Sequence, residues 1–194
     1  MALAETLRGA QANTALDLGC GVGRHALALA GMGFSVTAVD MAQEGLAEVS
    51  RSARDAGLEI ATQAAPMSAL PFPAGAFDFV LAWNVIYHGD GDIVRRTIAG
   101  IRRVLKPGGS FQATMLSKRN IGYGVGREVS PNTFSRDPTP GDPDDEDKAH
   151  PHFYCNAAEL VSLLAGFELK SLADVEQRKP NAWHWQFVAE RIAD

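Results

Sequence analysis

The run ALDLGCGVGRHALALA, from Ala15 to Ala30, constrains the fold more than any other part of the chain. A short apolar run that ends at Leu18 has the length of a buried strand, and apolar residues from Ala26 onward follow a helical period. The glycines between them permit positive φ angles and close approach of a ligand. The run therefore predicts a strand, a glycine turn and a helix whose N-terminus attracts an anionic or carboxylate-bearing ligand.

The spacing of the glycines indicates which ligand the turn binds. Dinucleotide dehydrogenases use G-x-G-x-x-G, so the G-x-G-x-G found here disfavours a nicotinamide-dependent oxidoreductase. The run resembles motif I of the class I S-adenosylmethionine (SAM)-dependent methyltransferases, whose product is S-adenosylhomocysteine (SAH). The resemblance places Asp17 at the sulfonium and amino end of SAM and wraps the turn, with Gly19, Cys20, Gly21 and Gly23, around its methionine part. The alternative is a turn that only joins a strand to a helix.

A second acidic residue ends the next expected strand, which runs from Gly33 to Asp40. A carboxylate about 20 residues beyond a glycine turn can accept hydrogen bonds from both ribose hydroxyls of an adenosine, and the resemblance gives Asp40 this role. Asp40 could instead be the N-cap of the following helix, expected near residues 41–56. If the ribose role holds, Met41 packs on the adenine.

The segment after the third expected strand departs from the family pattern. The strand is expected at residues 58–63, and Pro66 stands where relatives usually carry an acid that accepts a hydrogen bond from the adenine amino group. Proline has no such acceptor and no N–H, so contact with the ring is left to the backbone of Met67 or Ser68. This departure keeps a second hypothesis open, a SAM-binding regulator or pseudoenzyme without turnover.

The fourth expected strand, residues 77–82, opens into the segment WNVIYHG. In an open α/β sheet the ligand lies beyond the carboxyl ends of the parallel strands. Trp83 and Asn84 are therefore expected to lie between cofactor and substrate. A helix over residues 92–105, capped by Asp90 or Asp92, and a Pro-Gly stop precede a fifth strand at 110–116.

The resemblance extends over nearly the whole chain and implies a Rossmann-like α/β fold. The doubly wound, mostly parallel sheet is expected to have seven strands in the order 3-2-1-4-5-7-6, with the last strand antiparallel and helices on both faces. A capped helix starts near Asn156, and strands six and seven are expected at residues 167–172 and 183–190. We expect one domain over residues 1–194, with a lid or substrate loop at about 117–152, because this stretch has no strand or helix period.

The histidines fall where a substrate is expected. His88 follows the fourth strand, His152 precedes a helix that begins at the ligand edge, and His184 opens the antiparallel strand at that edge. Imidazole suits a general base near neutral pH, so we expect one of the three to be a base or a substrate anchor, with Tyr154 close by. Structural histidines are the alternative for each. We assign no metal, although several imidazoles could hold one.

Composition limits the acceptor and the location. The net charge of −5 argues against a broad nucleic-acid interface. We expect no membrane span, because no apolar run is long enough to cross a bilayer, and no signal peptide, because the first residues lack its long apolar core. Two cysteines give no disulfide framework. We expect a cytoplasmic enzyme that acts on a small molecule. The run GRHALALAGMGFSVTAVD is similar to the tellurite-resistance type within the family.

Overall fold

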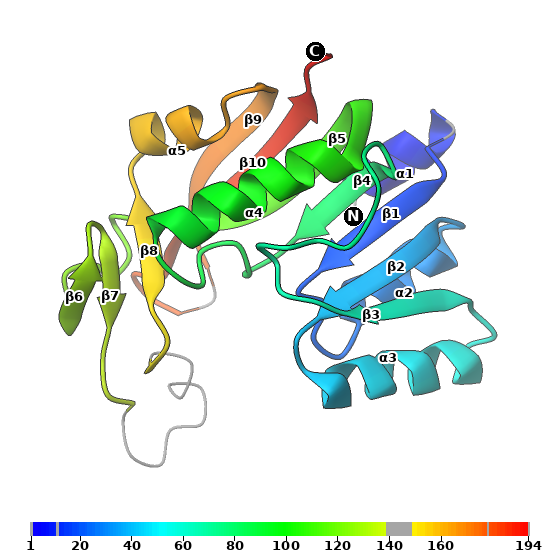
Figure 1. Ribbon diagram of the computed structural model, residues 1–194, viewed down its shortest axis with the longest axis horizontal. Coiled ribbons are helices and arrows are strands. Elements are labelled where there is room, and N and C mark those ends of the chain that lie inside the picture. The colour runs from blue at the N-terminus through cyan, green and yellow to red at the C-terminus, as the bar shows by residue number, and fades with distance from the viewer. Residues whose placement is uncertain (1, 11, 139–148, 178, 194) are drawn as a thin grey trace.

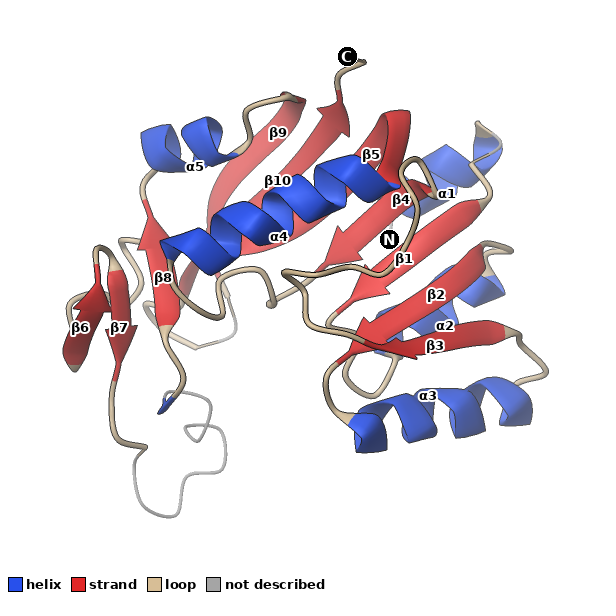
Figure 2. Cartoon of the chain, in the orientation of Figure 1, coloured by secondary structure: helices blue, strands red, loops and turns tan. Residues whose placement is uncertain are grey.

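The structure, a computed structural model, describes residues 2–10, 12–138, 149–177 and 179–193 (Figures 1 and 2). Its ten strands are β1 (Thr14–Leu18), β2 (Ser35–Asp40), β3 (Ile60–Ala64), β4 (Phe77–Ala82), β5 (Leu105–Ser117), β6 (Arg127–Ser130), β7 (Thr133–Ser135), β8 (His152–Cys155), β9 (Phe167–Glu176) and β10 (Trp183–Arg191). Its helices are α1 (Ala2–Gly9), α2 (Arg24–Gly31), α3 (Gln43–Asp55), α4 (Gly91–Val104) and α5 (Ala157–Leu163).

The predicted strand order is confirmed, and the predicted count of seven strands is wrong. Strands β3-β2-β1-β4-β5 pair in parallel, and β10 lies antiparallel between β5 and β9, which is the order 3-2-1-4-5-7-6. The additional strands form a branch in which β8 pairs with the end of β5, β7 with β8 and β6 with β7. The branch extends beyond the carboxyl end of β4 (Figure 1).

Helices cover both faces of the sheet at its central strands, where β1 and β4 are buried almost throughout, whereas the outer strands β3 and β9 are largely exposed. Alternate residues of β1 enter two cores: Ala15 packs in the core with α1, α2 and α3, whereas Leu16 and Leu18 pack in the core with α4 and α5. The short helix α1, which sequence reasoning missed, adds the buried Ala4 to the first core. The two helical layers therefore leave the strand ends as the place for a ligand.

Several boundaries differ from expectation; β9, for example, continues to Glu176 instead of ending near residue 172. Strand β5 begins at Leu105 rather than at Ser110, because the Pro-Gly segment forms an irregularity within the strand instead of a turn before it. The expected loop at 117–152 is not wholly irregular, since β6 and β7 form a hairpin inside it. Its residues 139–148 lie outside the described part of the chain. A function as a lid stays a prediction.

In the described part of the chain, none of the helices has the length and apolar character required to span a bilayer.

Candidate functional site

The glycine turn is fixed to the second strand by backbone hydrogen bonds. The N–H groups of Gly19 and Cys20 donate to the carbonyl of Val39 at 2.7 and 3.0 Å. A Cβ at Gly19 would overlap Val85 in the segment after β4, and one at Gly23 would lie 2.6 Å from Val49 on α3. Glycine is therefore required at both positions, because a neighbouring valine occupies the place of a Cβ and because the backbone has a positive φ.

Gly21, the middle glycine, differs from its neighbours. It has a φ of +53°, and a Cβ there would meet nothing within 4 Å. Its backbone N–H donates to Oδ2 of Asp40 at 2.8 Å. The turn therefore has one open side, beside the carboxylate that ends β2, where a ligand can approach the backbone.

Asp40 links the turn to the start of α3. Its Oδ1 accepts a hydrogen bond from the N–H of Ala42 at 2.9 Å, and Oδ2 accepts from Gly21. The N-cap residue of α3 is Ala42, so the alternative reading of Asp40 as N-cap is wrong. A carboxylate has about four acceptor sites, which leaves capacity for the two ribose hydroxyls assigned to it.

Asp17 lies below the turn with only 1% of its surface exposed. Burial raises the pKa of its carboxyl to about 7, against a hydrogen bond from the backbone of Ala26 that lowers it. Its Oδ2 is buried and has no hydrogen-bond partner among the described residues. A buried acceptor without a donor is costly, and the amino group of a ligand such as SAM would satisfy it. The residues at the turn thus fit this cofactor.

The thiol of Cys20 is buried within the turn. Burial, with Asp17 and Asp40 nearby, raises the pKa of the thiol to about 12, so the thiol is neutral. Contact of Cys20 with the cofactor stays a prediction.

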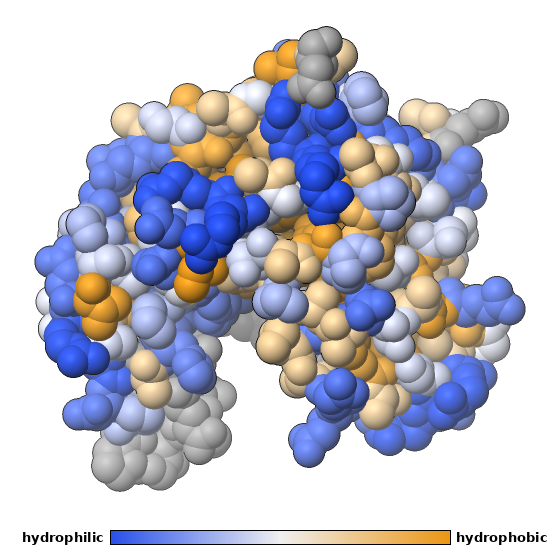
Figure 3. All heavy atoms as spheres, viewed as in Figure 1, coloured by the Kyte–Doolittle hydropathy of each residue, from blue (hydrophilic) through white to orange (hydrophobic). Residues whose placement is uncertain are grey.

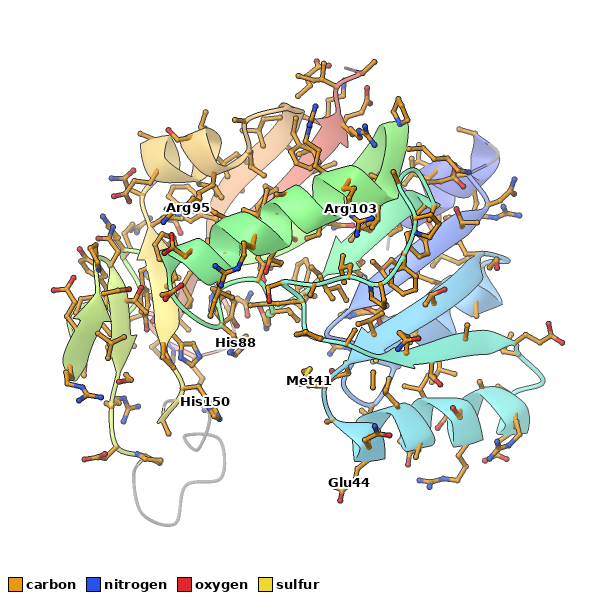
Figure 4. The ribbon with its side chains drawn as sticks, viewed as in Figure 1. Met41, Glu44, His88, Arg95, Arg103 and His150 are labelled. Atoms are coloured by element: carbon orange, nitrogen blue, oxygen red, sulfur yellow. The ribbon has the colours of Figure 1, made fainter. Side chains whose placement is uncertain are left out.

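The residues expected near the adenine surround the carboxyl edge of the sheet. Met41 is 67% exposed directly after β2, whereas Met67 is partly buried against the core. Figure 3 shows the surface indented at its lower edge, between the β6–β8 branch and the side formed by β2 and α3. In Figure 4, His88 lies on one side of this region and Met41 on the other.

The segment after β4 carries the predicted residues Trp83 and Asn84. The ring of Trp83 meets His25 of α2 edge-on, with 6.2 Å between centroids; burial lowers the pKa of His25, which favours a neutral imidazole. Asn84 has a φ of +60° and is held by Thr114 of β5. The hydroxyl of Thr114 accepts from the Asn84 N–H at 2.7 Å and donates to its Oδ1 at 2.9 Å.

The three predicted histidines come together around Tyr87. Its ring centroid lies 4.8 Å from that of His88, 5.8 Å from that of His152 and 5.9 Å from that of His184. His88 and His152 are paired directly by an antiparallel β-bridge, because the chain after β4 runs beside β8. The added branch of the sheet is what brings His152 to this position. Sequence reasoning did not single out Tyr87, although its segment was expected at the ligand edge.

Backbone carbonyls fix the tautomers of two of these histidines. Nδ1 of His152 donates to the carbonyl of His150 at 2.7 Å, and Nδ1 of His184 donates to that of Ala182 at 2.9 Å. In the neutral ring Nε2 is then the basic nitrogen. In His88, Nε2 makes the hydrogen bond, to the carbonyl of Asn84 at 3.2 Å.

Two cavities meet at His184. A cavity of about 430 Å³ is lined by Tyr87, His152, His184 and the predicted Tyr154. A second cavity, of about 800 Å³, extends from His184 past Trp83 to Arg24, the residue after the glycine turn. His184 therefore lies between the turn and the smaller cavity. The floor of the second cavity includes residues that sequence reasoning missed, namely Gln112, Gln177 and Gln186.

The metal alternative finds no support in the described residues, among which no group of three or more histidine, cysteine or acidic side chains could hold an ion.

A parallel α/β sheet with a glycine turn at the start of a helix and an acid at the end of the second strand defines a nucleotide-binding protein of the doubly wound class. Residues 15–109 match the methyltransferase domain family. Over these residues, about half of the chain, the protein belongs to the SAM-dependent methyltransferases.

Individual relatives agree with this family. The chain is similar to ubiquinone biosynthesis O-methyltransferase from Caulobacter vibrioides, with 39% identity over 105 residues that cover 53% of this chain and 40% of the relative. The matched segment thus spans less than half of that protein. These matches do not test the likeness to the tellurite-resistance type, which stays a prediction.

Solved structures share the fold over nearly the whole chain. A SAM-dependent methyltransferase from Methanosarcina mazei has 24% identity and a TM-score of 0.78, with 94% of both chains covered. A 1,6-didemethyltoxoflavin-N1-methyltransferase from Burkholderia thailandensis, solved with SAH bound, has 22% identity and a TM-score of 0.73, covering 98% of this chain and 77% of that one.

Proposed function

We propose that the protein binds SAM and transfers its methyl group to a small-molecule acceptor. The observation that carries the proposal is the glycine turn whose open residue, Gly21, is hydrogen-bonded to Asp40 above the unsatisfied carboxyl of Asp17. Gly19, Gly21 and Gly23 would lie against the methionine part, Asp17 would receive the amino group, and Asp40 would bind the ribose. When bound, SAM supplies an electrophilic methyl carbon.

The chain itself must orient the acceptor and remove its proton. We assign the base role to His184, because its Nδ1–H is bonded to a carbonyl, which leaves Nε2 as the basic nitrogen, and because the residue lines both cavities. His152 and Tyr154 line the same cavity as anchors for the acceptor, and His88 orders the segment after β4 through Asn84. Positioning of reactants accounts for much of the rate in such a displacement.

The test replaces histidines and separates turnover from cofactor binding. In His184→Ala the rate of SAH formation should fall by about 10²-fold or more, the usual contribution of a general base, while the affinity for SAM stays that of the wild type. Acceptors come from a cell extract incubated with isotopically labelled SAM and followed by mass spectrometry. His150→Ala, whose side chain is exposed and lines neither cavity, is the matched control and should retain most of its turnover. Unchanged turnover in His184→Ala would refute the assignment.

A SAM-binding regulator without turnover is the second candidate. Its specific support is Pro66, which is exposed after β3 where relatives usually carry an adenine-binding acid. SAH formation with any pool of acceptors excludes this candidate.

A small-molecule acceptor and a cytoplasmic location are part of the proposal. The net charge of −5 supports the choice of acceptor, because a nucleic-acid substrate calls for a basic face. The reaction class is that of SAM-dependent methyltransferases, EC 2.1.1.

A further inference from the structure

The cavity of about 800 Å³, here called the glutamine cavity, has a floor whose composition selects a substrate class. Its volume lies within the range of small-molecule sites. We propose that the glutamine cavity binds an uncharged, planar part of the acceptor that carries a lactam or similar amide edge. This inference rests on the proposed function, since it names the class of acceptor whose reacting group lies at His184, a residue that lines the same cavity.

The floor of the glutamine cavity is one face of the sheet. Phe79 and Leu81 of β4 line it, and Trp83 continues their alternation beyond the end of the strand. Gln112 of β5 is the register partner of Leu81, and it lines the cavity together with Gln186 of β10. The floor therefore has an apolar half from β4 beside an amide half from β5 and β10.

The two amides of the floor are close neighbours. Gln186 is paired with Thr114 in the antiparallel register, so Gln112, two residues before Thr114, lies diagonally opposite Gln186 on the same face. Both side chains are partly exposed, and neither has a hydrogen-bond partner among the described residues, whereas Gln177 donates to Oδ1 of Asn84 at 3.4 Å. A side-chain amide offers both N–H donors and a carbonyl acceptor. The pair thus matches a lactam edge, in which a C=O and an N–H group are adjacent.

The planar shape of the ligand follows from the apolar half of the floor. Phe79 and Leu81 are buried, with 1% and 4% of their surface exposed, and Trp83 is partly exposed beside them. The ring of His25 meets the indole edge-on, with 6.2 Å between centroids, and so restricts its orientation. A fixed indole beside a flat strand surface favours planar rings, which stack on it or meet it edge-on.

The absence of charge on the ligand follows from the positions of the charged lining residues. Arg24, Glu176 and Lys179 line the cavity and are all exposed, so they stand at its rim rather than in its floor. A charged ring on the floor would lose water without gaining a counter-charge there. A wholly apolar ring would leave both amides without partners. An uncharged ring with an amide edge avoids both costs.

The test uses four probes of similar size. The SAH-saturated chain is titrated calorimetrically with the planar lactam 1-isoquinolinone and with three analogues. Isoquinoline lacks the amide edge, 1-naphthoate replaces it with a charge, and octahydro-1-isoquinolinone keeps it on a ring system that is not planar. The 1-isoquinolinone should bind about tenfold more tightly than each of the others, the scale expected for an unmatched polar group. Equal or tighter binding of any analogue, or no binding of 1-isoquinolinone, overturns the proposal.

Two glutamine variants assign the preference to the floor. Gln112→Met and Gln186→Met keep the length of the side chain, and each should lose most of the preference for 1-isoquinolinone over isoquinoline. Ser171→Met is the matched control and should keep the preference. Ser171 is exposed in β9, pairs with Val188 on the same face of the sheet and lines neither cavity.

All three variants should keep the SAH affinity and the melting temperature of the wild type. An unchanged preference in either glutamine variant overturns the assignment to the floor. Failure of SAH itself to bind the wild type refutes the proposed function instead, so the two failures are distinct.

Discussion

At the scale of single residues, Gly21 and Gly57 form a matched pair. Both have a positive φ, +53° and +66°, and a Cβ at either would meet nothing within 4 Å. Only Gly21 belongs to the turn that is hydrogen-bonded to Asp40. Alanine at either position should therefore cost a similar 1–2 kcal/mol, roughly, from the left-handed backbone alone.

The two alanine variants should lose a similar amount of stability, but only the one at Gly21 should bind SAM more weakly. Gly21→Ala should weaken SAM binding by about tenfold or more, because a methyl group then stands on the open side of the turn. Gly57→Ala should bind SAM as the wild type does. Denaturant unfolding and calorimetry of both variants make the comparison, and equal SAM affinity for the two would show that the open side of the turn does not contact the cofactor.

The raised pKa of Asp17 predicts that cofactor binding releases a proton. Burial raises the pKa of its carboxyl to about 7, so near neutral pH the group is about half protonated. An ammonium group placed beside it favours the charged form and lowers its pKa. Binding should therefore release up to about half a proton at pH 7, and affinity should rise as pH increases through this value.

Calorimetry in two buffers with different ionisation enthalpies measures how many protons are released when the cofactor binds. The wild type should show a buffer-dependent enthalpy of SAH binding, and Asp17→Asn should lose it. A buffer-independent enthalpy in the wild type would mean that the ligand's amino group does not reach Asp17.

At the scale of elements, helix α5 depends on its first turn. The side chain of Asn156 accepts from the Glu159 N–H at 2.9 Å, and Glu159 accepts from the Asn156 N–H at 2.7 Å. Glu159 also pairs with Lys118 at 2.7 Å. Burial alone would raise the pKa of the Glu159 carboxyl, but these hydrogen bonds hold it below its ordinary value.

Removing the cap should cost stability without touching the cofactor site. Asn156→Ala should lower the free energy of unfolding by about 1 kcal/mol, because the Glu159 N–H loses its acceptor, and should leave SAH affinity unchanged. Urea unfolding measures the first quantity and calorimetry the second. Asn156→Asp retains a side-chain acceptor, so its free energy of unfolding should stay close to that of the wild type. If Asn156→Asp is destabilised as much as Asn156→Ala, the acceptor is not what stabilises the helix.

Local patterns predicted the elements that carry the cofactor site. The strand β1, the glycine turn and α2 follow from a continuous run, and Asp40 could be placed because it ends a β-branched strand. The branch β6–β8 was not predicted, because its strands are only three or four residues long. The strands β6 and β7 form a local hairpin, but β8 joins the sheet by pairing with β5, far along the chain. The same non-local pairing explains why three histidines could be assigned to one edge but their meeting at Tyr87 could not.

Within the site, the contacts that the sequence did not predict involve residues that belong to no motif. Thr114 lies in the middle of β5, and nothing in the strand pattern indicates that its hydroxyl holds Asn84 in a left-handed conformation. Such a contact depends on a loop and a strand meeting in space, and hydrophobic periodicity carries no information about that.

At the scale of the molecule, the sheet places the glycine turn and the cavity that the histidines line at the same edge. The ends of β1 and β2 provide the glycine turn and Asp40. The cavity of about 430 Å³ is lined by residues that follow β4 and β5, by residues of β7 and β8, and by the start of β10. Ligands of open α/β sheets lie beyond the carboxyl ends of the strands, and both sites lie there. The account therefore depends on the identity of the ligand at the turn.

Calorimetric titration of the whole chain with SAH and with NAD tests that identity most directly. If the turn binds SAM, SAH should bind at least about a hundredfold more tightly than NAD. Asp40→Asn should weaken the binding of SAH. Asp55 is exposed at the end of α3, and Asp55→Asn should leave the binding of SAH unchanged. Tighter binding of NAD, or SAH binding that is indifferent to Asp40, would contradict the account.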